Sequence, residues 1–354
     1  MKHKIKQLRE NRKEKKLAKQ EAAGRLPRIT NDTVAEHREE VLSGARKYIY
    51  PLQHSKHKIV LVTTSLFIVA FLSFTTYCVV SLYKLQNTST FLYRVTQVVP
   101  FPIARSGSHF ISYENYLFEL RHYMHYYETQ QKIGFDTESG KQQLDDYKRR
   151  SLDKVINDAI IKKMAQEQGI TVTDQEVEEQ ITLARNQNRL GGSSRVFEDV
   201  IKEYYGWTLN DFKRSIRSQI LEQKVTAALD QEATAKLEAV KAELNNGRPF
   251  ADVAKQYSDD EATKPNGGDF GTIDKANTAV SPQTTQVLFT QSAGGVSDAI
   301  VISYDTGYAY EIIKTNEVTG DKAKGAHIII RLKDVNTYLN DQKDKQPARR
   351  YIRL

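Results

Sequence analysis

A run of 25 residues without a charged side chain constrains this chain more than any other feature of its sequence. It extends from Ile59 to Tyr83, reads IVLVTTSLFIVAFLSFTTYCVVSLY, and is bounded by Lys58 and Lys84. As a helix rising about 1.5 Å per residue it would be roughly 37 Å long, enough for a ~30 Å hydrocarbon core with some tilt. A core helix of a soluble domain fits poorly, because apolar residues appear on every face. The hydroxyls of its Ser and Thr residues can bond back to helix carbonyls. We therefore predict a transmembrane helix over residues 59–83.

The charges on either side of this segment predict its orientation. Residues 1–58 carry 16 Lys/Arg and 7 Asp/Glu; since this arm has a net charge of +9 and the whole chain +8, residues 59–354 carry −1. The excess of Lys/Arg before the helix places the arm in the cytoplasm and residues 84–354 outside it. We expect the arm to contact anionic lipid. Binding of RNA or DNA is the weaker alternative, and no nucleic-acid partner is expected.

Two other kinds of targeting segment are disfavoured by the residues themselves. A cleaved signal peptide would not follow a 58-residue arm, and no A-x-A-like site comes after the apolar run. A lipoprotein signal would place small residues before its cysteine, whereas Cys78 follows Thr-Thr-Tyr. Because Cys78 is the one cysteine of the chain, an intrachain disulfide is also excluded.

The next part of the chain has the periodicity of a helical domain, which we assign to residues 110–230. An apolar, strand-like linker over 84–109 precedes it, and its prolines argue against a helix there. Apolar spacing predicts helices over 113–130, over a long stretch ending at Gly169, from Thr173 onward with Glu176 completing a capping box, over 195–205, and from Thr208 onward. The tyrosine stripe of the first helix is explained by core packing, with a peptide-binding surface as the alternative.

Two stretches of this region carry a family resemblance. VINDAIIKKMAQEQGITVTDQEVEEQI and FEDVIKEYYGWTLNDFKRSIRSQI resemble the N-terminal chaperone domain of SurA- and PrsA-type foldases, because cap, glycine and apolar positions agree together. The resemblance implies binding of unfolded polypeptide.

A glycine-rich stretch, KPNGGDFG at residues 264–271, is the second distinctive feature. Taken alone, it predicts a surface turn leading into a strand. Its context, PFADVAKQYSDDEATKPNGGDFG followed by VLFTQSAGGVSDAI and TGYAYEIIKT, resembles the parvulin family of peptidyl-prolyl isomerases, whose motif reads dFaelAkkyS.d..s...GGdlG. The resemblance covers about residues 235–315 and implies an α+β domain with a four-stranded antiparallel sheet, which we assign to residues 231–334.

The opening strand of a parvulin is missing before residue 235, but a matching strand, GAHIIIR at 325–331, appears after the domain. In the family fold the first and last strands are antiparallel neighbours. We therefore predict a circular permutation in which residues 326–331 pair with residues 308–315. The alternative is the stub of a second parvulin domain, for which the 23 residues after Arg331 are too few.

The parvulin resemblance also implies the site. We predict His327, Glu311 and Asp269 as the catalytic residues, with Asp269 holding the glycine turn. The predicted substrate-binding residues are Phe289, Val280, Thr284 and Phe270. Thr284 and Glu311 replace apolar and histidine positions of the family, so we expect a more polar pocket and weak activity. A lone strand histidine such as His327 is also explained by a satisfied core position.

The sequence predicts no cofactor. The histidines lack metal-ligand spacing, and Gly267-Gly268 is not followed by the Gly-Lys-Ser/Thr of a phosphate loop. The whole is interpreted as an α+β, single-pass, membrane-anchored foldase of the extracytoplasmic side, an isomerase with unfolded or proline-containing polypeptide clients. An inactive holdase that binds extended polypeptide is the alternative. For the basic tail, residues 335–354, a final helix is the one expectation.

Overall fold

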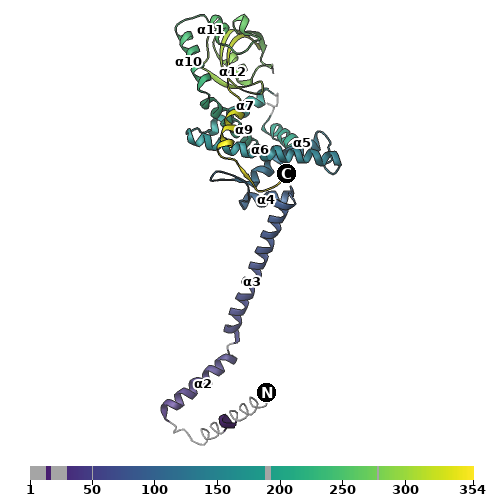
Figure 1. Cartoon of the computed structure of the whole chain (residues 1–354), viewed down its shortest axis with the longest axis vertical. Helices are drawn as coiled ribbons and strands as arrows, with labels where there is room; N and C mark the ends of the chain where they lie inside the picture. Colours follow the sequence, from purple (N-terminus) through teal and green to yellow (C-terminus); the bar gives the residue numbers. More distant parts are fainter. Residues whose placement is uncertain (1–12, 17–29, 50, 188–192, 277–278) are drawn as a thin grey trace. The chain divides into compact units, whose positions relative to one another are not determined.

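The computed structural model describes residues 13–16, 30–49, 51–187, 193–276 and 279–354 (Figure 1). It divides into two units, Met1–Cys78 and Val79–Leu354, which we describe separately. Of the basic arm predicted over residues 1–58, residues 1–12, 17–29 and 50 lie outside the described residues.

Among the residues that the structure describes, the first unit has a helical turn at residues 13–16 and two longer helices, α2 (Asn31–Ile49) and α3 (Pro51–Val79). A π-helical turn, η1 (Val80–Lys84), follows α3 at the start of the second unit. The stretch His57–Lys84 is long and apolar enough to cross a membrane, judged by length and composition. Thr63, Thr75 and Thr76 donate hydrogen bonds of 2.8 to 2.9 Å to carbonyls four residues earlier, as their sequence positions predict. Their hydroxyls are thereby satisfied within the helix, which suits an apolar environment.

The segment expected to be an extended linker contains a helix, and that expectation is wrong over Thr90–Val98. These residues form α4, which begins at the cap Ser89 and ends before Pro100 and Pro102. The prolines exclude a helix at their own positions but not upstream, because each disturbs only the preceding turn. Strands β1 (Pro102–Ser106) and β2 (His109–Ser112) then form a tight hairpin.

The five predicted helices follow. They are α5 (Tyr113–Thr129), α6 (Glu138–Glu167), α7 (Asp174–Gln187), α8 (Ser194–Tyr205) and α9 (Leu209–Leu229). Thr208 and Asp211 form a reciprocal capping box, Thr173 and Glu176 make the same pair of bonds, and Gly206 ends α8 in the left-handed conformation. The local sequence therefore determines these helix ends.

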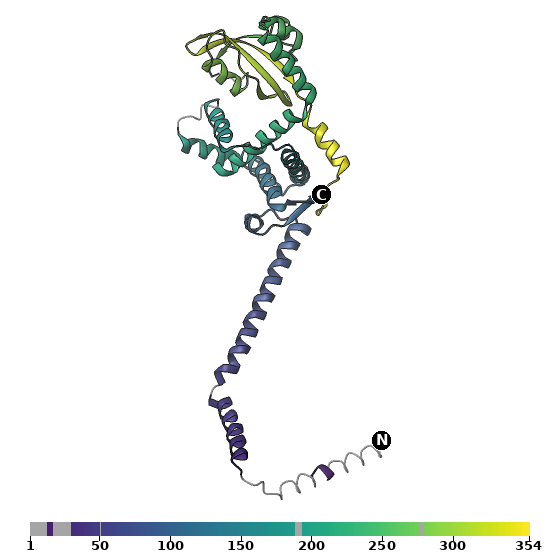
Figure 2. The same cartoon turned by 90° about the vertical axis from the view of Figure 1, so that its left-hand side faces the viewer.

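The basic tail does more than form its expected helix. After α13 (Val335–Lys345), Arg349–Arg350 form strand β7, which pairs with β1 and gives a three-stranded sheet in the order β2-β1-β7. Figure 2 shows α13, in yellow, running back to the helices from a second, four-stranded sheet, which is described below. Arg350 pairs with Asp153 of α6 at 2.6 Å, and the side chain of Ile352 is buried. We call residues 79–229 and 335–354 the helical region, and residues 230–334 the sheet region.

The described residues of the sheet region form four strands: β3 (Asp269–Asp274), β4 (Ile300–Tyr304), β5 (Gly307–Thr319) and β6 (Lys322–Arg331). They form an antiparallel sheet in the order β3-β6-β5-β4. The helices of this region are α10 (Gln231–Asn245), α11 (Phe250–Tyr257) and α12 (Pro282–Thr290), with a 3-10 turn at Lys264–Asn266. Side chains of α10 and α11 pack with Ile312, Ile328 and Ile330, whereas Leu288 of α12 packs with Ile313. Because side chains alternate along a strand, α10 and α11 cover one face of the sheet and α12 the other.

The predicted pairing of the late strand is confirmed. Residues 309–315 of β5 pair with residues 325–331 of β6, with Ile313 opposite His327, and β6 lies between β3 and β5. A strand that follows the domain in sequence thus completes its centre, as the permutation requires.

Candidate active site

His327 is held at both of its ring nitrogens. Its Nδ1 lies 2.8 Å from Oε1 of Glu311, and its Nε2 lies 2.9 Å from Oδ2 of Asp260. Glu311 and His327 come from the paired strands β5 and β6 and share the sheet face that α12 covers, whereas Asp260 lies in the loop after α11. All three side chains are buried, with Glu311 only 1% exposed.

Hydroxyl groups also donate hydrogen bonds to both carboxylates. Thr284 of α12 donates a 2.5 Å hydrogen bond to Oε2 of Glu311. Thr263 donates to Oδ2 of Asp260 at 2.5 Å, and the Tyr304 hydroxyl donates to its Oδ1 at 3.1 Å. Buried carboxylates need such donors, because an unpaired charge in the interior is costly. We call these six residues, Asp260, Thr263, Thr284, Tyr304, Glu311 and His327, the histidine network.

The network favours the charged forms of its central groups. Burial alone would lower the pKa of His327, but the hydrogen bonds and charges of Glu311 and Asp260 outweigh it and raise that pKa above its usual value. Burial opposes ionisation of Asp260 as well, yet hydrogen bonds from Thr263, His327 and Tyr304 lower its pKa to about 2. These hydrogen bonds therefore stabilise the imidazolium of His327 and the carboxylate of Asp260.

The glycine-rich stretch brings its backbone against this network. Gly268 has φ +82°, and its carbonyl accepts a 2.9 Å hydrogen bond from the His327 backbone N–H. A Cβ at this position would lie 2.2 Å from the His327 carbonyl oxygen, so no residue larger than glycine fits without a backbone shift. The turn thus serves a close approach between two segments as well as leading into β3.

Apolar side chains lie beside the network. The Phe270 ring meets the His327 ring edge-on, with centroids 5.0 Å apart and planes at 68°. Gly325 makes room for it, since a Cβ there would come within 2.6 Å of the Phe270 ring and 2.5 Å of Leu288. Phe270, Val280 and Phe289 are all partly buried against the cluster of Leu288 and Ile313.

The structure brings together most of the residues predicted from sequence. His327, Glu311 and Thr284 are directly linked, and Phe270, Val280 and Phe289 share one apolar cluster. The side chain of Asp269 is exposed and accepts a 2.7 Å bond from the Gly271 N–H, so it holds the turn as expected but not the histidine.

The carboxylate on Nε2 of His327 belongs to Asp260 and not to the predicted Asp269. The parvulin motif contains an acidic position two residues after its serine, and Ser258-Asp259-Asp260 matches it, so the sequence held a signal for this residue. Ser258 fixes the loop, because its hydroxyl accepts bonds from the N–H groups of Asp260 and Ile329. Tyr304 and Thr263 had no such signal, since only the fold brings them to Asp260.

This geometry limits what the histidine can do. With Nδ1 and Nε2 both bonded to carboxylates, the ring has no free N–H for a substrate. Its ring contacts Phe270, which packs with Val280 and Phe289 against the cluster of Leu288 and Ile313. The hydrogen bond between Thr284 and Glu311 also means that these two polar replacements satisfy each other.

The fold and the histidine network can now be compared with those of known protein families. Two family models match this chain, one over most of the helical region and one over most of the sheet region. Residues 52–226 match the SurA-like N-terminal domain, and residues 219–317 match the PPIC-type PPIASE domain, which is the rotamase family. The chain therefore matches a foldase of the SurA/PrsA type, as its sequence motifs predict.

Individual relatives carry the same description. The chain is 29% identical over 238 residues to "Foldase protein PrsA" of Caldanaerobacter subterraneus subsp. tengcongensis, covering 61% of this chain and 70% of that protein. It is 34% identical over 125 residues to the proteins of the same name from two Streptococcus pneumoniae strains, covering 34% of this chain. The chain spans 37% of the length of these streptococcal relatives.

Proposed function

We propose that this protein is a membrane-anchored foldase that catalyses cis–trans isomerisation of X-Pro bonds in unfolded polypeptides outside the cytoplasm. The observation that carries this proposal is the histidine network beneath Phe270, in a domain that matches the PPIC-type family. The SurA-like region supports polypeptide as the client.

The required chemistry is the lowering of a rotational barrier. An X-Pro amide resists rotation by ~18–20 kcal/mol because its resonance must be broken. No covalent bond to the protein is needed; the site must bind the twisted amide more tightly than the planar one. The twisted amide has lost charge separation, so an apolar surface that excludes water favours it.

The named residues divide this task between them. Phe289, Val280 and Phe270 would hold the proline ring and its neighbour. His327, Asp260 and Glu311 form a rigid support for the Phe270 ring, since each of their polar side-chain atoms is already bonded within the network. His327 is therefore a positioning residue, and we expect its loss to act through the placement of Phe270.

Isomerisation of a short proline-containing peptide by the full chain in detergent tests this proposal. We expect Phe289→Ala combined with His327→Ala to lower the rate enhancement at least about 10-fold, which corresponds to ~1.4 kcal/mol of transition-state binding. Tyr204→Ala, at an exposed aromatic residue of α8, is the matched control and should leave the rate unchanged. Equal rates in wild type and double variant would contradict catalysis at this site and favour the holdase, for which suppression of client aggregation is the assay.

The location rests on separate observations. The stretch His57–Lys84 supports a membrane anchor, and the excess of Lys/Arg before it supports a cytoplasmic N-terminus. In intact spheroplasts, added protease should digest residues 85–354 and spare the arm. Protection of the network-bearing region would reverse the orientation.

A further inference from the structure

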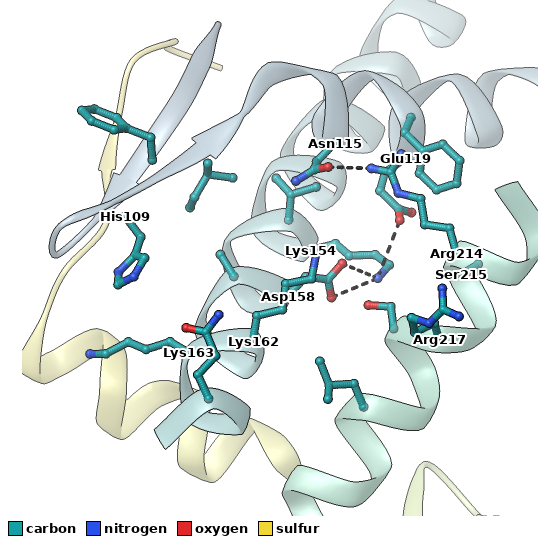
Figure 3. A pocket seen from close by; sticks show the side chains of 18 residues that line it. His109, Asn115, Glu119, Lys154, Asp158, Lys162, Lys163, Arg214, Ser215 and Arg217 are labelled. Carbon is teal, nitrogen blue, oxygen red and sulfur yellow. Dashed lines mark hydrogen bonds and ion pairs between the residues drawn. The ribbon is translucent and has the colours of Figure 1, made fainter. Parts of the chain in front are cut away.

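The helical region contains a cleft that the isomerase chemistry does not use. Its volume is about 380 Å³, and its walls come from β2, α5, α6 and α9 (Figure 3). Val155, Ala159 and Leu221 provide apolar surface between several charged side chains. The cleft is therefore amphipathic.

One wall of the cleft is the edge of a sheet. In the order β2-β1-β7, strand β2 lies at the edge of the sheet, and within the described part of the chain it pairs with β1 alone. Three consecutive residues of β2 line the cleft: His109, Phe110 and Ile111. Since consecutive side chains point to opposite faces, this pattern indicates that the backbone edge of β2 borders the cleft. An edge strand offers N–H and C=O groups to an added strand.

The carboxylates of the cleft are already occupied. Five Lys or Arg residues and two carboxylates line it, a net charge of +3 with His109 neutral. Lys154 lies 3.0 Å from Asp158 and 3.8 Å from Glu119, so both carboxylates share one lysine (Figure 3). The remaining cations are thus not neutralised from within the cleft.

Two of these cations are suited to a ligand. Lys162 forms no hydrogen bond or ion pair with any residue that the structure describes. Arg217 pairs with Asp174, whose side chain is 93% exposed, and such surface pairs contribute little stability. Arg214, in contrast, is fixed by Glu114 and Asn115 and lies over the Phe118 ring at 4.2 Å. Lys162 and Arg217 therefore have capacity for an incoming carboxylate.

We propose that this cleft binds an extended client segment, which adds as a strand to β2 and places an Asp or Glu side chain against Lys162 and Arg217. The inference rests on the proposed chaperone function and specifies its preference: acidic side chains alternating with apolar ones. A strand edge beside the cleft and its apolar lining fit a polypeptide better than a lipid headgroup, which needs neither.

Three labelled peptides test the proposal by fluorescence anisotropy with the full chain in neutral detergent. The first alternates Glu with apolar residues, the second carries Gln for Glu, and the third keeps Glu but is N-methylated at alternate backbone nitrogens. We expect the Gln peptide to bind about 5-fold and the N-methylated peptide about 10-fold more weakly than the first. The Gln peptide lacks the carboxylate for the ion pair, and the N-methylated peptide lacks the backbone N–H groups for the strand hydrogen bonds.

Charge reversal in the protein provides the matching test. The double variant Lys162→Glu with Arg217→Glu should bind the Glu peptide at least about 10-fold more weakly. The control, Lys202→Glu with Arg195→Glu on α8 outside the cleft, should change the affinity for this peptide less than about 2-fold. Equal loss in the two double variants, or equal binding of the three peptides, would overturn the proposal.

Further outcomes separate this inference from the function on which it rests. If the Gln and N-methylated peptides bind as tightly as the Glu peptide, the proposed strand addition and acidic preference are wrong, while polypeptide binding by the helical region is supported. If no peptide binds while prolyl isomerisation persists, the client role of the helical region falls too. If phosphatidylglycerol vesicles bind through Lys162 and Arg217 and no peptide does, the cleft is a lipid site and the proposal is wrong.

Discussion

Replacing Gly268 by alanine should destabilise the sheet region through one identifiable contact. The residue has φ +82°, where a Cβ costs ~1–2 kcal/mol. Its Cβ would also lie 2.2 Å from the His327 carbonyl oxygen, so the turn or β6 must move. Such overpacking costs ~1–3 kcal/mol. Weakening the bond from the His327 N–H to the Gly268 carbonyl adds ~0.5–1.5 kcal/mol. We expect a total of about 2.5–6.5 kcal/mol.

Gly271 offers a closely matched control in the same stretch. Its φ is +80°, but nothing lies within 4 Å of a Cβ built there. Gly271→Ala should therefore cost only the conformational ~1–2 kcal/mol. The difference between the two variants measures the close approach to His327 and not the backbone conformation.

Hydrogen exchange is the suitable assay, because it reports the opening of β6 separately from the rest of a chain with several regions. In Gly268→Ala, amides of residues 326–331 should exchange at least about 30-fold faster than in Gly271→Ala, which corresponds to ~2 kcal/mol. Equal exchange in the two variants would refute the reasoning, since the added methyl group would then have met no obstacle.

The histidine network gives two further predictions. Thr284→Val should lower the free energy of unfolding by ~1–3 kcal/mol, because it leaves a buried oxygen of Glu311 without its donor. The control is Thr285→Val, which removes a hydroxyl bonded to the carbonyl of Ser281, the N-cap of the same helix, and should cost less than ~0.5 kcal/mol. Urea unfolding measures both. Equal costs would show that the bond to Glu311 does not matter for stability. The raised pKa of His327 should contribute stability that is fully present below pH 6.5, the ordinary value, and lost as pH rises through its folded-state pKa. The lowered pKa of Asp260 should contribute stability that is fully present above pH 3.8, the ordinary pKa of Asp, and that is lost as the pH falls towards the folded-state pKa of about 2. His327→Gln should remove the loss on the alkaline side in unfolding measured against pH, and an unchanged profile would contradict the assignment.

Much of the helical region could be predicted because its signals are local. Thr173, Thr208 and Gly206 begin or end helices through bonds to residues three or four positions away. The helix α4 is not predicted from the prolines of its segment, because Pro100 and Pro102 restrict only the residues next to them and α4 lies upstream. Strand β7 has only two residues, both arginine, so neither length nor alternation marked it.

The site could be predicted in kind but not in detail. Glu311 and Thr284 are 27 residues apart, and only the packing of α12 on β5 makes them partners. The choice between Asp260 and Asp269 depends on which carboxylate points toward His327 after the glycine turn. Both follow plausible motif positions, so side-chain direction, a tertiary property, decided it.

Strand β7 makes the sheet region an insertion within the helical region. Two covalent connections join them: one runs directly from α9 into α10, and the other passes through α13 to the strand beside β1. A single flexible joint would let the sheet region swing freely, but two attachments restrict it to movements that both can follow. During synthesis, moreover, the three-stranded sheet must wait for residues 349–350, so the ribosome has already produced the whole histidine network before the helical region is complete.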